Sequence, residues 1–119
     1  MNKVMLVDDD AMMLNLLQTL LELEGFEVYP VDSAGCQSLL EKVNSVKPDA
    51  ILLDIHLRSC SGMDLLRELR TNHPLNDVRI LMTSGEDLRE SCLAAGADGF
   101  LLKPYMPEEL IQHLRASGS

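Results

Sequence analysis

The stretch KVMLVDDDAMM, residues 3–13, places a short apolar run directly before three consecutive aspartates, Asp8, Asp9 and Asp10. The run VMLV, residues 4–7, has the length and continuous apolar character of a strand that is buried on both faces. Neighbouring carboxylates repel one another, so the three acids need either full solvation or a cation that binds them. Asp10 is better placed to cap a following helix than to bind a cation.

Similar apolar runs recur along the chain and alternate with segments that have helical spacing. Gly25 and Gly96 stand where helices end, and Pro107 stands where the last one begins. This alternation predicts an α/β fold of the (βα)5 type: a doubly wound, open parallel sheet of flavodoxin-like order 2-1-3-4-5, with helices on both faces. The expected strands cover residues 4–7, 26–31, 50–53, 78–82 and 99–102, and the expected helices cover about 11–24, 34–46, 63–72, 87–95 and 107–116. We expect one domain over residues 1–116, with 117–119 as a tail that could begin a linker to an output domain.

Composition excludes several classes of protein. The 119 residues carry a formal net charge of −9 with scattered Lys and Arg, so we expect no direct binding to nucleic acid. No apolar run approaches the roughly 18 residues of a membrane helix, and the start of the chain does not resemble a secretory signal. We therefore expect no membrane association and a cytoplasmic location.

The three cysteines, Cys36, Cys60 and Cys92, are widely spaced and form no CxxC or Cys/His cluster. We expect neither a zinc site nor a disulfide framework, and interpret all three as reduced cysteines that contribute to packing.

Four of the five predicted strands end in polar residues. Asp8 and Asp9 follow the first, Asp54 the third, Thr83 the fourth and Lys103 the fifth. Ligands of such sheets bind beyond the carboxyl ends of the strands, so these side chains are expected to converge on one rim. The oxygen-only donor set suits Mg²⁺, which can also coordinate a phosphoryl oxygen while Lys103 and Thr83 contact the others. Asp54 can then act as a nucleophile and become an aspartyl phosphate.

Four separated motifs together resemble the response-regulator receiver domain, and they occur in that family's order over nearly the whole chain. They are VDDD at 7–10, LLDIHLRSCSG at 52–62, LMTSG at 81–85 and AGADGFLLKP at 95–104.

By this resemblance, Asp54 is the phosphoacceptor. Asp8 and Asp9 bind Mg²⁺ together with Asp54 and the main-chain carbonyl of His56. The resemblance makes Thr83 the switch hydroxyl and Lys103 the phosphate contact, with Phe100 as the aromatic switch residue and Pro104 following a peptide bond that is commonly cis.

Some positions depart from the family pattern. Arg58 stands where the family most often has Pro, and Ser61 where it often has Asp. These departures indicate a looser and less acidic loop after Asp54. His56 and Gly85 occupy positions that tune the lifetime of the phosphoryl group in the family.

The resemblance implies a phosphorylation-switched signalling domain and not an enzyme acting on a separate substrate. A histidine kinase or histidine phosphotransfer domain is the expected donor. The expected output is an altered binding face at the fourth helix, fifth strand and fifth helix. That face would act on an output domain or a downstream protein, and a phosphorylation-dependent homodimer is a further alternative.

Other functions remain as alternatives. A phosphotransferase of the haloacid-dehalogenase type uses similar residues but has a DxD motif, whereas Ile55 and His56 follow Asp54. A receiver that works only as a phosphorylation-independent binding module is disfavoured by the intact acidic pair, Thr83 and Lys103. An FMN-binding flavodoxin is disfavoured because no Gly-rich phosphate loop follows the first strand.

The first predicted helix is more apolar than one buried stripe requires. Its sheet-facing residues are expected to be Met13, Leu14, Leu17, Leu20 and Leu21. A second stripe of Met12, Leu16, Thr19 and Leu23 points largely away from the first. Two interpretations stay open: partial burial against the fifth helix, or a docking surface for a histidine phosphotransfer partner.

Overall fold

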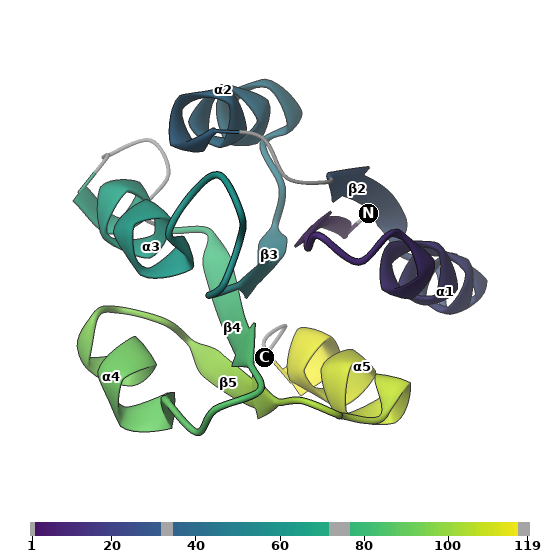
Figure 1. Ribbon diagram of the computed structural model, residues 1–119. Coiled ribbons are helices and arrows are strands. Elements are labelled where there is room, and N and C mark those ends of the chain that lie inside the picture. Colours follow the sequence, from purple (N-terminus) through teal and green to yellow (C-terminus); the bar gives the residue numbers. More distant parts are fainter. Residues whose placement is uncertain (1, 32–34, 72–76, 117–119) are drawn as a thin grey trace.

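The computed structural model describes residues 2–31, 35–71 and 77–116, and these form a parallel sheet between two layers of helices (Figure 1). The five strands are hydrogen-bonded in the order β2-β1-β3-β4-β5, all parallel, which confirms the predicted fold. The strands are β1 (Lys3–Val7), β2 (Glu27–Val31), β3 (Ala50–Asp54), β4 (Arg79–Ser84) and β5 (Gly99–Leu102). The helices are α1 (Ala11–Leu23), α2 (Cys36–Val46), α3 (Gly62–Thr71), α4 (Arg89–Ala94) and α5 (Pro107–Ala116).

The helices bury two separate apolar clusters against the two faces of the sheet. Helices α1 and α5 cover one face, and α2, α3 and α4 cover the other, as Figure 1 shows. Leu14 and Leu17 of α1 and Leu110 of α5 are buried in the cluster on the first face. The central strand β3 is buried along its whole length, because both of its faces are covered. Strand β2 is at the edge of the sheet, with β1 as its neighbour on one side. It can therefore contain Pro30, because proline has no backbone N–H and an edge strand does not need to bond to strands on both sides.

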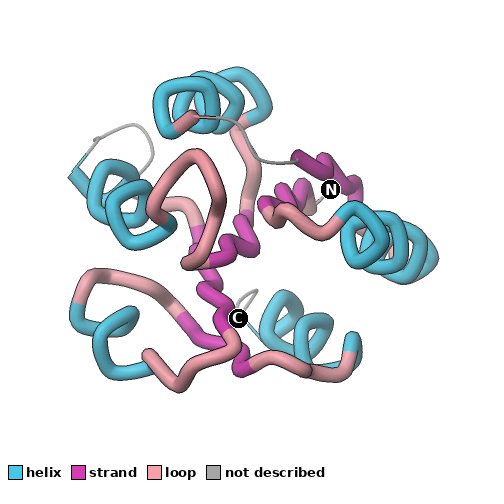
Figure 2. The backbone as a smooth tube through the Cα atoms, in the orientation of Figure 1, coloured by secondary structure: helices cyan, strands magenta, loops and turns pink. Residues whose placement is uncertain are grey.

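The predicted boundaries are close to the observed ones. Figure 2 shows the strands grouped at the centre and the helices around them. Gly25 and Gly96 have φ angles of 96° and 109°, which is the left-handed backbone expected just after a helix. The fourth helix is shorter than predicted, and its N-cap residue Leu88 offers no side-chain hydrogen bond to the free backbone donors. The predicted tail, 117–119, lies outside the described residues.

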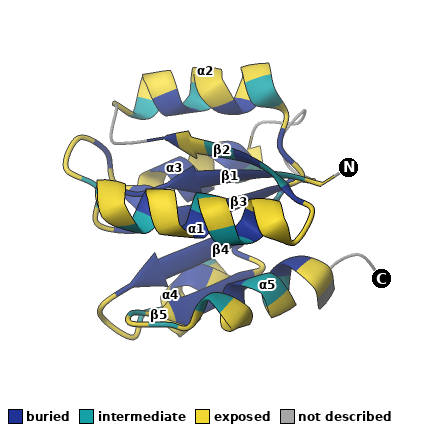
Figure 3. Ribbon diagram, turned by 90° about the vertical axis from the view of Figure 1, so that its right-hand side faces the viewer, coloured by how far each residue is buried: buried dark blue, intermediate teal, exposed yellow. Residues whose placement is uncertain are grey.

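The outer face of α1 tests one of the two interpretations of its second stripe. Met12 and Leu23 are 83% and 77% exposed, so partial burial against α5 is wrong for these two residues, whereas Leu16 is 51% exposed. Figure 3 shows exposed residues along the outer face of α1. The inner residues Leu14, Leu17 and Leu21 are buried as predicted. Docking of a partner on the exposed stripe stays a prediction.

The interpretation of all three cysteines as reduced is wrong for two of them. Cys36, at the start of α2, and Cys60, just before α3, form a disulfide across a sequence separation of 24 residues, with Cα atoms 5.1 Å apart. Such a pairing depends on how α2 and the loop after β3 are placed in space, which sequence spacing does not encode. Cys92 is free and buried, as predicted.

Among the described residues, no helix combines the length and apolar character needed to cross a membrane.

Candidate phosphoacceptor site

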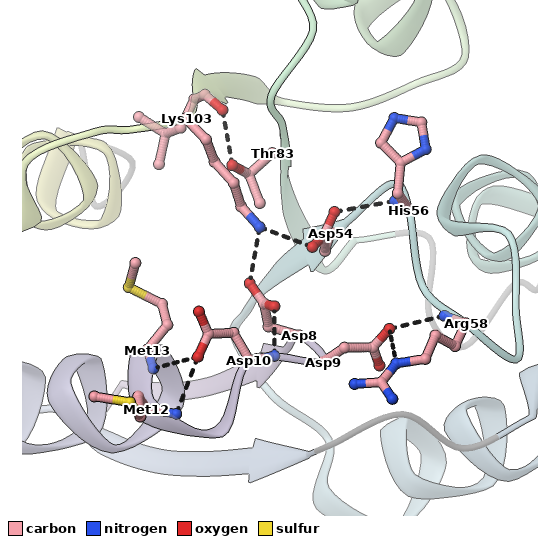
Figure 4. A network of polar contacts seen from close by, with 11 residues as sticks. Asp8, Asp9, Asp10, Met12, Met13, Asp54, His56, Arg58, Thr83 and Lys103 are labelled. Carbon is pink, nitrogen blue, oxygen red and sulfur yellow. Dashed lines mark hydrogen bonds and ion pairs between the residues drawn. The ribbon is translucent and has the colours of Figure 1, made fainter.

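The predicted polar residues lie at the carboxyl edge of the sheet because the strands that precede them are parallel (Figure 4). Asp8 follows β1, Asp54 ends β3, and Lys103 follows β5. In the sheet register Asp54 lies beside Thr83 of β4. Both carboxyl residues are nearly buried, with Asp8 at 5% and Asp54 at 6% exposure.

Lys103 connects the two buried carboxylates. Its Nζ donates to Asp54 Oδ2 at 2.8 Å and to Asp8 Oδ2 at 3.2 Å (Figure 4). Burial by itself lowers the pKa of Lys103, but the hydrogen bonds and charges of Asp54 and Asp8 outweigh it, and the net pKa is raised. The lysine is therefore held as an ammonium ion beside Asp54.

The remaining oxygens of these carboxylates are held by the backbone. Asp54 Oδ1 accepts from the His56 N–H at 3.0 Å, and Asp8 Oδ1 accepts from the Asp10 N–H at 2.9 Å. Asp10 itself caps α1, since its side chain accepts from the N–H groups of Met12 and Met13, as predicted. The Asp54 and Asp8 side chains are thus oriented before any ligand binds.

Asp9 differs from the other two carboxylates of the cluster. Its Oδ2 accepts from the Arg58 N–H at 2.8 Å, and the Arg58 guanidinium lies 3.6 Å away. Its Oδ1 is buried and has no hydrogen-bond partner within the described structure. Sequence reasoning treated Arg58 only as a departure from a family pattern and missed this contact, because it joins residues 49 positions apart.

The loop after Asp54 is held by several contacts; that it is looser than in the family stays a prediction. A bridge between His56 and Ser61 closes the loop, the Gly62 N–H donates to the Ile55 carbonyl at 2.9 Å, and the disulfide holds Cys60. At the start of the loop, the exposed His56 side chain lies beside Glu86, with 3.3 Å between Nε2 and Oε1.

Thr83 and Phe100 are both buried. The Thr83 hydroxyl donates to the Leu101 carbonyl of β5 at 2.8 Å (Figure 4). The Phe100 ring is 1% exposed, and the guanidinium carbon of Arg89 lies 5.6 Å from its centroid. The Lys103–Pro104 peptide bond is cis, as the resemblance implied.

The carboxylates of the site can supply some, but not all, of the ligands of a hard cation. No three acidic, histidine or cysteine side chains of the described ranges are grouped tightly enough to form a complete protein cage. Mg²⁺, however, is usually bound through one or two carboxylates, with water and substrate phosphate as its other ligands. The partnerless Asp9 Oδ1 is a buried oxygen suited to such an ion.

Tyr105 is a neighbour of the site that sequence reasoning missed. Its hydroxyl is buried without a hydrogen-bond partner in the described part of the chain. Burial, followed by the charges of Asp8 and Asp54, raises the pKa of this phenol, so it remains protonated. The only sequence signal was its position two residues after Lys103.

Comparison with known proteins agrees with this geometry. The family model described as "Response regulator receiver domain" matches residues 4–115. The chain is 40% identical over 116 residues to the transcriptional regulatory protein CpxR of Klebsiella pneumoniae, covering 98% of this chain and 49% of that protein. It is 34% identical to the DNA-binding response regulator MtrA of Mycolicibacterium paratuberculosis, covering 96% and 50%. The chain therefore spans about half the length of these curated relatives.

Solved structures show the same likeness. The chemotaxis protein CheY4 of Vibrio cholerae superposes with a TM-score of 0.84 at 28% identity, covering 98% of each chain. The sheet order, the polar residues at the strand ends and the family match lead to one conclusion: the chain belongs to the response regulator receiver domain family and is a receiver domain of two-component signalling.

Proposed function

We propose that Asp54 accepts a phosphoryl group from the phosphohistidine of a histidine kinase or a histidine phosphotransfer domain. The observation that carries this proposal is the Lys103 ammonium, which lies 2.8 Å from Asp54 Oδ2 and 3.2 Å from Asp8 Oδ2. Asp54 attacks phosphorus in line, the bond from phosphorus to the donor imidazole breaks, and the imidazole leaves. Lys103 can then pair with a phosphoryl oxygen and offset the added negative charge.

Asp8, Asp9, Asp54 and the His56 carbonyl are the proposed ligands of Mg²⁺, which when bound would neutralise the charge of the phosphoryl oxygens. The protein's own contribution is orientation. The backbone N–H groups of His56 and Arg58 hold Asp54 and Asp9 respectively. Asp9 Oδ1, which has no partner within the described ranges, supports a ligand role for this residue.

The proposed switch is a rotation of Thr83. Its hydroxyl would leave the Leu101 carbonyl and donate to a phosphoryl oxygen on Asp54, the neighbouring residue in the sheet register. Phe100, on the adjacent strand, would respond to the space that this rotation changes. We propose that the surface of α4, β5 and α5 transmits the change to an output domain or a downstream protein, or to a second copy of the chain.

The domain is proposed to act as a phosphoacceptor switch in the cytoplasm and not as an enzyme with a separate substrate. The names of its relatives describe transcriptional regulation and DNA binding. With a net charge of −9 and scattered cations, this chain is not proposed to contact nucleic acid itself.

Acetyl phosphate labelling tests the proposal. Incubation with acetyl phosphate and Mg²⁺ should add one phosphoryl group, detected by intact-protein mass spectrometry, and chelation of the metal should prevent it. The Asp54→Asn variant should remain unlabelled, and equal labelling of this variant would show that Asp54 is not the acceptor. No labelling of the wild type under any condition would favour the phosphorylation-independent binding module instead.

A second measurement tests the metal ligands. The Asp9→Ala variant should bind Mg²⁺ about 10-fold or more weakly in a fluorescence or calorimetric titration, because it removes a carboxylate ligand. An unchanged affinity would remove Asp9 from the proposed ligand set without affecting the role of Asp54.

A further inference from the structure

The Cys36–Cys60 disulfide joins the start of α2 to the loop that follows the phosphoacceptor strand. Cys60 is 7% exposed and packs in the apolar cluster beneath α2, α3 and α4, with Cys36 partly buried against the same cluster. The bond therefore fixes the far end of the loop over residues 55–61 to a helix from a different part of the chain.

This loop is in direct contact with the site. At its far end, a Cβ added to Gly62 would lie 2.4 Å from the Asp54 carbonyl oxygen, so there is no free space between the end of the loop and the backbone of Asp54. At its centre, the Arg58 N–H donates to Asp9 Oδ2. At its start, the His56 N–H donates to Asp54 Oδ1. A more mobile loop would thus hold both the Asp9 and the Asp54 side chains less firmly.

One cysteine of the disulfide, Cys60, borders a hollow that is open to solvent. This hollow of about 620 Å³ is lined by residues 55–61, including Cys60. Cys92 is unsuited to the same chemistry because it is fully buried and because burial raises the pKa of its thiol. A small thiol is therefore expected to react with the Cys36–Cys60 disulfide and not at Cys92.

We propose that Cys36 and Cys60 form a site of reversible thiol–disulfide exchange that controls the order of the phosphoacceptor loop, an inference that rests on the function proposed above. A low-molecular-weight thiolate attacks one sulfur, the Cys36–Cys60 bond breaks, and a mixed disulfide forms. A second thiolate of the same class then attacks the external sulfur. The products are two protein thiols and one oxidised dimer of the reagent, and an oxidised thiol dimer drives the reverse reaction. Disulfides of proteins in reducing compartments are usually transient, catalytic or redox-sensing.

The oxidised state is the one in which phosphorylation is faster. With the disulfide closed, the loop holds the Arg58 N–H against Asp9 and the His56 N–H against Asp54. Reduction removes the covalent link to α2, and the loop then loses order that the proposed Mg²⁺ site requires. Removal of a group that orients a metal ligand lowers metal affinity by about 10- to 100-fold. A loosened loop keeps these groups, so it should lower Mg²⁺ affinity less, by about 3- to 10-fold.

The experiment compares the same purified chain after treatment with oxidised glutathione or with dithiothreitol. Thiol counting under denaturing conditions should give one thiol in the oxidised sample and three in the reduced one. Mg²⁺ affinity and the rate of acetyl phosphate labelling should both fall about 3- to 10-fold on reduction and recover on reoxidation. Three thiols in the oxidised sample, or equal Mg²⁺ affinity and labelling in the two states, would overturn the inference.

Two variants make the assignment specific. Cys36→Ser should behave like the reduced wild type and no longer respond to dithiothreitol. Cys92→Ala, which removes the free cysteine, should keep the full response, and loss of the response in this variant would overturn the assignment to Cys36 and Cys60. If neither redox state is labelled on Asp54, the proposed function fails; if both are labelled equally, only the redox inference fails.

Discussion

Lys103 is the residue on which the electrostatics of the site depend most directly. Its ammonium contacts Asp8 and Asp54, two carboxyl groups that the fold holds almost out of water. In the proposed function it contacts a phosphoryl group, whereas in the structure its partners are the carboxylates themselves. We therefore expect it to stabilise the unmodified domain as well as to contribute to the proposed chemistry.

We predict that Lys103→Met lowers the free energy of unfolding at pH 7 by about 1–3 kcal/mol in the absence of Mg²⁺, because two buried carboxylates lose their counter-ion. The raised pKa of Lys103 gives the sign of the pH dependence. Its stabilising contribution is fully present below the unfolded-state pKa of about 10.4 and is lost as the pH rises through the higher folded-state value. Urea unfolding of both proteins should show a constant difference from about pH 7 to 9. Equal stabilities at pH 7 would show that the observed contacts contribute nothing net.

Substitutions of Arg58 can distinguish the effect of its guanidinium charge from the effect of its backbone N–H. Its guanidinium is 82% exposed and lies near Asp9, where it opposes the approach of a cation, while its N–H holds the same carboxylate. We predict that Arg58→Ala increases Mg²⁺ affinity about two- to fivefold at low ionic strength, and that the gain shrinks in high salt. Arg58→Pro removes the N–H donor as well and should lose this gain. Titrations that rank the proline variant above the alanine variant would contradict the positioning role of the N–H.

At the scale of elements, α1 has an exposed face that is more apolar than the fold requires. Its inner stripe covers the sheet, and its outer stripe of Met12, Leu16, Thr19 and Leu23 is in contact with solvent. The helix begins immediately after Asp9 and Asp10, beside the proposed acceptor. A phosphotransfer partner that reaches Asp54 would therefore lie close to this stripe.

We predict that Leu16→Ser slows phosphotransfer from a histidine phosphotransfer partner about fivefold or more, as expected for an apolar interface residue worth over about 1 kcal/mol. Labelling by acetyl phosphate and the urea midpoint should stay unchanged, since the small molecule needs no docking surface and the side chain is 51% exposed. Leu93→Ser on α4 is a matched control, with a leucine that is 46% exposed on the other face of the sheet. Equal slowing in both variants, or normal transfer with Leu16→Ser, would rule out α1 as the specific surface.

For the whole molecule, the excess of negative charge affects stability most where carboxylates lie close together, at the carboxyl edge of the sheet. The chain has a net charge of −9, and three consecutive aspartates lie at one edge of the sheet. Lys103 offsets Asp8 and Asp54, whereas the cation beside Asp9 is the Arg58 guanidinium, which is 82% exposed and 3.6 Å away. Neutralising Asp9 therefore relieves repulsion while it keeps both ion pairs of Lys103 and loses only a solvent-screened one.

We predict that Asp9→Asn raises the melting temperature of the metal-free domain by about 2–6 °C, because it removes one charge while an amide oxygen can still accept from the Arg58 N–H. Mg²⁺ at about 10 times its dissociation constant should stabilise the wild type by about 1.4 kcal/mol through preferential binding to the folded state. The same Mg²⁺ concentration should have a smaller effect on the variant. Thermal denaturation with and without metal measures both effects. Glu41→Gln, at an exposed position of α2, controls for the loss of one negative charge anywhere on the chain.

The sequence by itself determined the element order, the parallel sheet and the strand ends that carry Asp8, Asp54, Thr83 and Lys103. These follow from local patterns, because strand and helix periodicities are read within short windows and parallel strands bring their carboxyl ends to one edge.

Only the tertiary structure decided which of these groups contact one another. The Cys36–Cys60 bond, the contact of Arg58 with Asp9 and the bond of the Thr83 hydroxyl to Leu101 each join segments that are far apart in the chain. The exposure of Leu16 likewise depends on how closely α5 packs beside α1. Residue spacing encodes which way a side chain points from its own element, whereas distances of a few ångströms across loops depend on the packing of the whole domain.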